Sequence, residues 1–321
     1  MSVPHVTALI TAYDCERFIG EAVDSALAQD YEGRLDVVVI DDGSTDGTAR
    51  ELASRDVRVI RQENRGYVAA THRAIAEGEG ELFALLDADD VWPADKIRRQ
   101  VAALGDAALL YGDMTVIDAE GNEIDPSWLG DASPPKDLAG WLCGNVATSS
   151  SILMRADMAR RWCPIPRGLA FADWYFAIRA MRESRVVYLP EPRTSYRFHG
   201  ENMSLGSSGE RHALQLREAL KFQRWWLRRA DPEPGLWAAW EAFEAFATKL
   251  QSVAETPFTQ LVRVTAEDRD LAEALGRQAR QALDAGNAHE ALAAGIRAAA
   301  ADPWCREARE TARQAALAVA G

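Results

Sequence analysis

Residues 5–90 alternate short apolar runs with segments of helical periodicity, and this alternation limits the folds open to the chain. The apolar runs cover residues 5–12, 35–40, 57–60 and 82–86. Residues 17–29 and 67–77 repeat apolar side chains at helical spacing between them. Strands and helices that alternate at this pitch form βαβ units, so we predict an α/β fold with a mostly parallel sheet.

Acidic residues follow three of the predicted strands. Asp14 comes after the first strand, Asp41-Asp42 after the second, and Asp87 to Asp90 after the fourth. Ligands bind outside the carboxyl ends of strands in open parallel sheets, so we expect these acids to meet at one binding edge. Crowded carboxylates repel one another unless a cation lies among them. Mg²⁺ or Mn²⁺ takes oxygen ligands and keeps substrate phosphates in its shell, so we predict a divalent cation that bridges the protein to a diphosphate.

A structural role is the competing explanation, because Asp also caps helices and shapes turns. We expect that role for Asp46 and Asp95, which come just before helical segments. Capping explains at most one of the three carboxylates in residues 87–90, Asp-Ala-Asp-Asp, so a binding site is favoured there.

Composition excludes several classes of protein. The 321 residues include 36 Lys and Arg and 49 Asp and Glu, for a net charge of −13, which argues against a nucleic-acid binder. No run of about 18 apolar residues is long enough to span a membrane. The N-terminus lacks the basic start of a secretory signal, and the four cysteines show no C-x-x-C pair that would indicate a zinc site. We therefore expect an acidic cytoplasmic protein.

The composition changes near residue 206, after the linker-like stretch 200–210. The later part is rich in Ala, Leu, Glu and Arg and poor in β-branched residues, which is typical of helices. We predict one domain over residues 1–205 and a helical region over 206–321. Within it, residues 272–303 resemble one tetratricopeptide-type hairpin, with Gly286, Ala291, Ala298 and Pro303 at the repeat's small-residue and proline positions. A single repeat needs a neighbour, so we expect it to dock on the first domain, on a second copy of the chain or on a partner.

Four motifs in the first domain carry a resemblance to a known family. They are VTALITAYD (6–14), LDVVVIDDGSTDGT (35–48), ENRG (63–66) and LFALLDADDVWPADKI (82–97). In order and spacing they resemble the N-terminal half of the family 2 glycosyltransferases, which have the GT-A fold. FADWYFAIRA (171–180) resembles the family segment with the catalytic base, and YRFHGENMS (196–204) resembles its closing segment. The resemblance covers residues 4–205 and leaves the last third of the chain outside.

The resemblance implies a set of donor-binding residues. Thr11, Tyr13 and Glu16 would line the nucleotide pocket, with Tyr13 packed on the base. Asp42 would accept a hydrogen bond from the base, and Asp87 would lie near the ribose. This set matches uridine-binding relatives at Thr11, Tyr13 and Asp42, so a UDP-sugar is the favoured donor.

The resemblance also implies residues for the metal and for catalysis. Asp89 would bind the metal directly, and His199 would approach the metal or the diphosphate from the closing segment. Asp173 would be the general base, and Asp90 would face the acceptor. As a separate alternative, Asp173 stands where a helix begins and would act only as its N-cap.

Three positions depart from the family pattern. Residues 11–14 read Thr-Ala-Tyr-Asp where the family has Pro and then Tyr-Asn, and Thr71-His72 replaces an Arg-Asn pair. Ala172 stands before Asp173 where the family often has Glu, so one carboxylate is missing.

The expected activity is a metal-dependent, inverting transfer of a sugar from a nucleoside diphosphate to a hydroxyl of a saccharide or glycoconjugate. The family resemblance places it in surface polysaccharide or glycoconjugate assembly, in the cytoplasm or at the inner face of the membrane. A sugar-phosphate nucleotidyltransferase is one alternative, but its Gly-rich basic loop is not present in residues 11–20, TAYDCERFIG. A non-catalytic scaffold with a degenerate site is the other, and the missing Glu before Asp173 keeps it open.

Overall fold

The structure of the chain is a computed structural model that describes residues 3–129, 145–166, 171–199 and 266–288, together with single residues elsewhere. Its contacts divide the chain into two units. The first holds residues 1–128 and 147–197, and the second holds 129–146 and 198–321. The predicted boundary near residue 206 lies outside the described residues.

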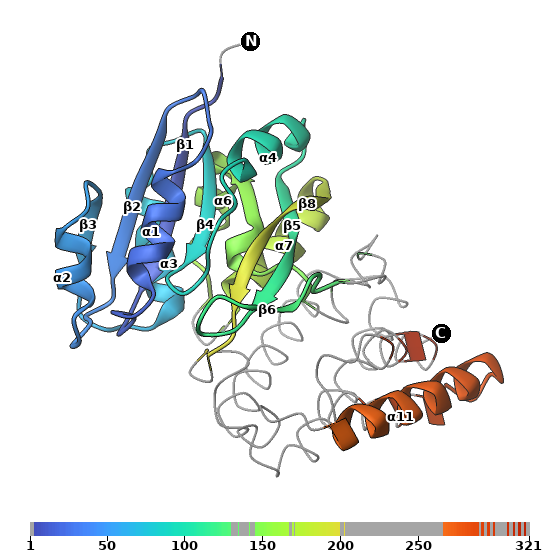
Figure 1. Cartoon of the computed structure of the whole chain (residues 1–321). Helices are drawn as coiled ribbons and strands as arrows, with labels where there is room; N and C mark the ends of the chain where they lie inside the picture. Colours follow the sequence, from blue (N-terminus) through green and yellow to red (C-terminus); the bar gives the residue numbers. More distant parts are fainter. Residues whose placement is uncertain are drawn as a thin grey trace. The chain divides into compact units, whose positions relative to one another are not determined.

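Within the described residues of the first unit, eight strands form one mixed sheet in the order β3-β2-β1-β4-β7-β5-β6, with β8 paired to β5 (Figure 1). The strands are β1 (Val6–Ala12), β2 (Leu35–Asp41), β3 (Arg58–Arg61), β4 (Leu82–Asp87), β5 (Leu109–Ile117), β6 (Glu123–Asp125), β7 (Ile152–Arg155) and β8 (Val186–Arg197). Strands β1 to β4 pair in parallel, and so do β5 and β8, whereas β7 runs antiparallel between β4 and β5. The prediction of a mostly parallel sheet is confirmed.

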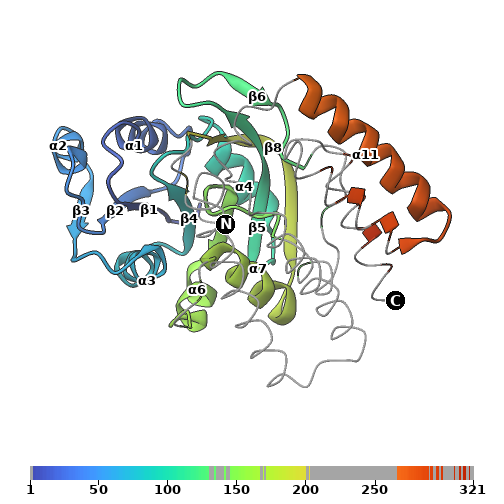
Figure 2. The ribbon, with the colours of Figure 1, turned by 90° about the horizontal axis from the view of Figure 1, so that it is seen from below.

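Helices cover both faces of this sheet (Figure 2). They are α1 (Ile19–Leu27), α2 (Thr48–Ala53), α3 (Tyr67–Glu77), α4 (Lys96–Leu104), α6 (Ala156–Trp162) and α7 (Ala172–Glu183), with a short 3₁₀ turn, η1 (Ser149–Ser151). Helix α1 lies on one face, and α3, α6 and α7 lie on the other. Strand β1 is therefore buried on both faces, which explains why its sequence is a continuous apolar run.

The loop after β2 depends on a glycine. Gly43 has φ +80°, a conformation that side chains disfavour, and a Cβ there would lie 2.8 Å from the backbone nitrogen of Asn64. The close approach brings the loop after β2 against the segment that leads into α3. These two segments form one wall of the carboxyl edge of the sheet.

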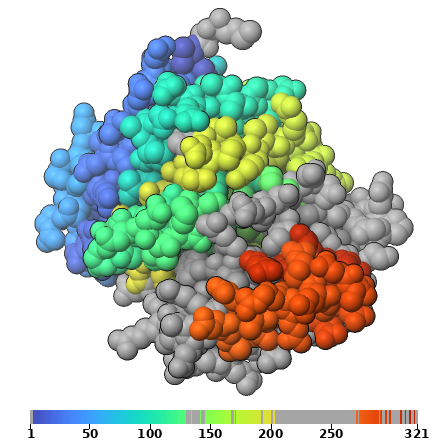
Figure 3. Space-filling model, turned by 45° about the vertical axis from the view of Figure 1, so that its right-hand side comes forward, coloured from blue at the N-terminus to red at the C-terminus, as the bar shows by residue number. Residues whose placement is uncertain are grey.

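The hairpin of β5 and β6 lies against the N-terminal elements. In the space-filling view its atoms (green) border those of the N-terminal segment (blue) (Figure 3). Arg17, just before α1, forms an ion pair of 2.8 Å with Glu120 in the turn of this hairpin. The hairpin therefore borders the same edge of the sheet as the acidic loops.

In the second unit, α11 (Ala266–Asp284) is followed by Gly286, which has φ +80°. The N–H of Asn287 donates to the carbonyl of Ala282 at 2.8 Å, and that of Gly286 donates to Leu283 at 3.0 Å. This is the Schellman arrangement that ends many helices. The rest of the predicted hairpin over 272–303 falls on residues described only singly, so the hairpin and the helical region 206–321 stay predictions. No helix in the described part of the chain is long and apolar enough to cross a membrane.

Candidate active site

The loops after β1 and β2 are joined by reciprocal hydrogen bonds. The carboxylate of Asp14 accepts from the N–H of Thr45 at 2.6 Å, and that of Glu16 accepts from the N–H of Gly47 at 2.7 Å. In return, the N–H of Glu16 donates to the carboxylate of Asp46 at 2.9 Å. Asp46 also accepts a hydrogen bond at 2.9 Å from the N–H of Thr48 at the start of α2, so the turn-shaping role predicted for it is confirmed.

Three predicted nucleotide-binding residues lie on these elements. Tyr13 is 48% exposed, so its ring offers surface on which a base could stack. Thr11 pairs in register with Asp87 of β4, which places these two predicted residues side by side. The carboxylate of Glu16 is already used by the N–H of Gly47, and its contact with a nucleotide stays a prediction.

Asp42 is buried and organises the turn before α3. Its carboxylate accepts hydrogen bonds from the side chain of Gln62 at 2.7 Å, from the N–H of Arg65 at 3.0 Å and from the N–H of Gly66 at 2.8 Å. A carboxylate has about four acceptor positions, so one remains for the predicted contact with a base.

The acidic turn after β4 brings several carboxylates together. Burial raises the pKa of the half-buried Asp87 well above its usual range, and the charges of Asp90, Asp89 and Asp173 act in the same direction. Asp87 is the last residue of β4 and Asp90 lies in the turn after it, whereas Asp173 comes from α7, so the fold joins residues that are distant in the sequence. Such a group is electrostatically unfavourable until a cation or a proton neutralises it.

Asp90 is 0% exposed, unlike a residue that faces a bound acceptor. Its Oδ1 accepts a hydrogen bond from the N–H of Arg197 at 2.9 Å, and its Oδ2 has no partner in the described part of the chain. Burial and the charge of Asp89 both raise the pKa of Asp90 well above its usual range. This position does not favour the acceptor contact inferred from the sequence, which stays a prediction.

Asp173 is the second residue of α7, so the predicted start of a helix here is confirmed. The N-cap of this helix is Phe171, and the carboxylate of Asp173 accepts from the N–H of Trp174 at 2.6 Å. The interpretation of Asp173 as the N-cap itself is therefore wrong. Ala172, where the family often has Glu, is fully buried.

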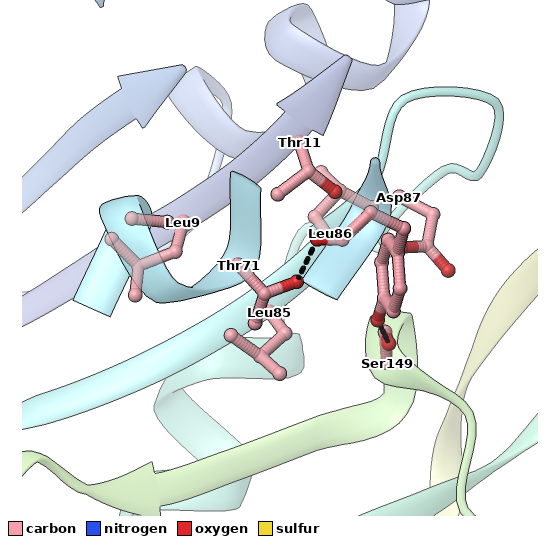
Figure 4. Close-up of a pocket in the computed structure, with 9 residues that line it drawn as sticks. Leu9, Thr11, Thr71, Leu85, Leu86, Asp87 and Ser149 are labelled. Carbon is pink, nitrogen blue, oxygen red and sulfur yellow. Dashed lines mark hydrogen bonds between the residues drawn. The ribbon is translucent and has the colours of Figure 1, made fainter. Parts of the chain in front are cut away.

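A small pocket lies beneath Thr11 and Asp87, between α3 and β4 (Figure 4). Its lining comprises Leu9, Thr11, Tyr67, Thr71, Ala74, Leu85, Leu86, Asp87 and Ser149. The hydroxyls of Tyr67 and Ser149 are hydrogen-bonded to each other. Burial raises the pKa of Tyr67 well above its usual range, as do the charges of Asp87 and Asp173, so Tyr67 lies near both predicted site carboxylates.

The serine turn η1 was not predicted from the sequence. Ser150 accepts the N–H of Asp87 on its hydroxyl at 2.9 Å, and its carbonyl accepts from the indole of Trp92 at 2.8 Å and from the hydroxyl of Thr194 at 3.1 Å. All three serines of the turn are buried. The run Thr-Ser-Ser-Ser directly before an apolar strand could have indicated it. Hydroxyl groups next to a buried strand are themselves buried and therefore need hydrogen-bond partners.

The donor set suits a divalent cation that also binds a substrate. Asp87 and Asp89 offer hard oxygen ligands beside the buried carboxylate of Asp90. No three His, Cys, Asp or Glu side chains among the described residues are placed to hold a metal by themselves. Diphosphate and water oxygens would have to complete the coordination. His199 belongs to the second unit, where its N–H donates to the Asn202 side chain at 2.9 Å, and its role as a ligand stays a prediction.

Residues 7–161 match the family described as glycosyl transferase family 2. An uncharacterized glycosyltransferase of Nostoc is 27% identical over 218 residues, which are 63% of this chain and 67% of the relative. The uncharacterized protein Rv1520 of Mycobacterium tuberculosis is 28% identical over 207 residues, 60% of this chain and 58% of that protein. The chain thus covers somewhat more than half of the length of this mycobacterial relative.

Solved structures share the fold. TarS residues 1–349 of S. aureus in complex with UDP-GlcNAc has a TM-score of 0.59 at 18% identity, covering 98% of this chain and 90% of that one. The mannosyltransferase PcManGT from Pyrobaculum calidifontis, in complex with GDP-Man and Mn²⁺, has a TM-score of 0.58 at 21% identity, covering 100% and 87%. The mixed, mostly parallel sheet with its helices matches a GT-A-like α/β fold. The family match thus covers residues 7–161, and the likeness to these solved structures shows the fold.

Proposed function

We propose that the chain is a metal-dependent, inverting glycosyltransferase that moves a sugar from a nucleoside diphosphate to a hydroxyl acceptor. One observation carries the proposal. Asp87, Asp89 and Asp90 gather at the carboxyl end of a parallel strand, and the charge of Asp173 from α7 reaches the same group. A carboxylate cluster with a separate acid nearby suits a reaction that needs both a neutralised diphosphate and a base.

The donor binds at the carboxyl ends of β1, β2 and β4. Tyr13 stacks on the base, Asp42 accepts a hydrogen bond from it, and Thr11 and Asp87 line the floor towards the ribose. A uridine nucleotide is the favoured donor, which the likeness to a UDP-GlcNAc complex supports. The likeness to a GDP-Man complex makes guanosine the alternative to test.

Asp89, with His199 from the closing segment, would hold the divalent cation. When bound, the cation supplies Lewis-acid assistance to the departing diphosphate. The likeness to a complex that contains Mn²⁺ supports divalent cation use. Asp87 adds a second negative charge close to the proposed cation.

Asp173 acts as the general base. It takes the proton from the acceptor hydroxyl while that oxygen attacks the anomeric carbon and the bond to the diphosphate breaks. A single displacement of this kind inverts the anomeric configuration.

The acceptor is proposed to be a saccharide or glycoconjugate in surface polysaccharide assembly, made in the cytoplasm or at the inner face of the membrane. The region after residue 205 would select that acceptor or bind a second copy of the chain. Deletion from about residue 270 onward should then spare donor hydrolysis.

The proposal is tested by measuring melting temperature with UDP, GDP and their sugars, with and without Mn²⁺. A ligand at about 100 times its dissociation constant adds about 2.7 kcal/mol of stability, so a true donor raises the melting temperature clearly. Product analysis then follows transfer to added acceptors. Release of pyrophosphate from a nucleoside triphosphate would instead indicate a nucleotidyltransferase, and binding without turnover would indicate a scaffold.

A further inference from the structure

Arg197, the last residue of β8, is 2% exposed and lies against the acidic turn. Its backbone N–H donates to the carboxylate of Asp90 at 2.9 Å, and its Nε donates to the carbonyl of Asp89 at 2.9 Å. One arginine thus holds two consecutive residues of the turn, one through its backbone and the other through its guanidinium group.

The guanidinium group has further partners on two other elements. It donates to Oε2 of Glu21 in α1 at 2.5 Å and to the carbonyls of Asp118 and Ala119 in the β5–β6 hairpin at 3.4 and 3.3 Å. It also lies over the ring of Phe18, 5.1 Å from the centroid. Arg197 therefore joins the acidic turn to α1 and to the hairpin.

The residue after the acidic pair is tied to the same strand. Val91 and Ser195 form a two-way backbone bridge, with N–H to carbonyl distances of 3.0 and 2.8 Å. Both ends of the segment 89–91 are consequently fixed by residues 195–197. These contacts hold the backbone of Asp89 in place.

We propose that Arg197 is a positioning residue for Asp89. It fixes the backbone of residues 89–90 in one conformation and so sets the direction of the Asp89 carboxylate before a ligand arrives. The inference rests on the proposed function in one respect, that Asp89 binds the cation. Residues that orient metal ligands typically contribute about 10- to 100-fold to metal affinity.

Only an arginine suits these contacts. Its planar fork donates in several fixed directions at once, whereas a lysine at this position offers one compact ammonium group on a flexible stem. Lys at position 197 keeps the positive charge and the backbone N–H to Asp90, but it cannot reach Asp89, Glu21 and the hairpin together. Arg197→Lys therefore separates positioning from charge.

The test compares Arg197→Lys with the control Arg155→Lys. Arg155 also donates to backbone carbonyls, those of Ala107 and Gly105, but away from the acidic turn. The first readout is hydrogen exchange of the metal-free protein over residues 87–92, where we expect about tenfold faster exchange in Arg197→Lys and no change in the control. The second is the Mn²⁺ concentration that gives half-maximal UDP binding, which should rise about tenfold or more in Arg197→Lys.

Glu21→Gln keeps the proposal testable if Arg197→Lys does not fold. The Glu21 side chain is 58% exposed, so its exchange for Gln should leave the fold intact while it weakens the hold on Arg197. We expect a rise of about two- to threefold in the half-saturating Mn²⁺ concentration, since this contact lies one step further from the metal.

The inference is overturned if folded Arg197→Lys shows the exchange and the Mn²⁺ dependence of the control, or if Glu21→Gln, as the substitute, behaves like the wild type. Loss of melting temperature to the same extent in both arginine variants, without a difference at residues 87–92, would show a structural role only. Absence of Mn²⁺-dependent nucleotide binding in the wild type would contradict the proposed function instead, and the hydrogen exchange of the metal-free protein still decides the positioning of the turn.

Discussion

The loops after β1 and β2 and the turn after β4 carry the same kind of side chain, but their carboxylates have opposite surroundings. In the first region, burial alone would raise the pKa of Asp46, yet hydrogen bonds from the Thr48 hydroxyl and from backbone N–H groups lower it. In the second region, burial and the neighbouring carboxylates raise the pKa of Asp87. The first group of acids has donors as partners, and the second has other acids.

The difference shows how one residue type serves two purposes along one edge of a sheet. An acid surrounded by N–H groups stabilises a loop whether or not a ligand is present. An acid surrounded by acids destabilises the metal-free protein and gains from a cation. Five predictions test this division, from the largest expected effect to the smallest.

Replacement of Asp89 by Asn should have the largest effect on activity. Loss of the metal ligand removes several kcal/mol of stabilisation of the departing diphosphate, so we expect transfer to fall by about 10³-fold. The melting temperature of the metal-free protein should not decrease, because one repelling charge is gone. Transfer assays with Mn²⁺ measure the effect, and full activity of the wild type in excess chelator would contradict it.

Asp173→Asn should lower transfer by about 10²-fold or more, the usual size of a general-base contribution. Asn is nearly isosteric and still accepts the hydrogen bond from Trp174, so melting temperature and donor affinity should stay close to wild type. Single-turnover transfer and nucleotide titration measure the two quantities. A near-normal transfer rate would mean that the base lies elsewhere.

Asp42→Ala tests the loop-building region through stability. It leaves Gln62 and two backbone N–H groups without their acceptor, at a cost on the order of 2–4 kcal/mol in unfolding free energy. Chemical denaturation measures the loss, with Asp106→Ala, at a side chain that is 89% exposed, as the control. If stability is unchanged but uridine nucleotides bind weakly, Asp42 serves the ligand more than the loop.

The two regions should respond to pH in opposite directions. A carboxyl whose folded-state pKa is raised, as in Asp87 and Asp90, binds protons more tightly in the folded state, so metal-free stability should fall as pH rises above the unfolded pKa of about 4. A carboxyl with a lowered pKa, as in Asp46, stabilises the fold above the unfolded pKa and loses this contribution as pH falls below about 4. Melting curves against pH should show a smaller fall in stability above pH about 4 in Asp87→Asn. In Asp46→Asn they should show a smaller loss of stability below that pH. Curves that match the wild type in both variants would contradict the division.

Glu16→Gln should have the smallest effect. The side chain is about half exposed, and Gln still accepts from the N–H of Gly47, so we expect a change under about 1 kcal/mol. Calorimetry and UDP titration measure it together. A strong loss of UDP affinity with normal stability would favour the predicted place of Glu16 in the nucleotide pocket.

The sequence by itself determined the alternation of strands and helices and the acids at the strand ends. The predicted helix over 67–77 is α3, and the predicted strand over 82–86 is β4 with one residue added. These features could be predicted because apolar periodicity and turn residues depend only on residues a few positions apart. For the same reason, the local pattern of a strand followed by acids pointed to residues 87–90 as a group, whereas the separate roles of Asp87 and Asp89 came from the family resemblance.

Only the tertiary structure decided which side chains support these acids. Arg197 reaches Asp90 across 107 positions, and Tyr67 reaches Ser149 across 82. The antiparallel strand β7, inserted between β4 and β5, brings the serine turn under the acidic group. No local pattern encodes such contacts, because they arise from how distant segments pack. Each contact is needed because a buried polar group without a hydrogen-bond partner is unfavourable.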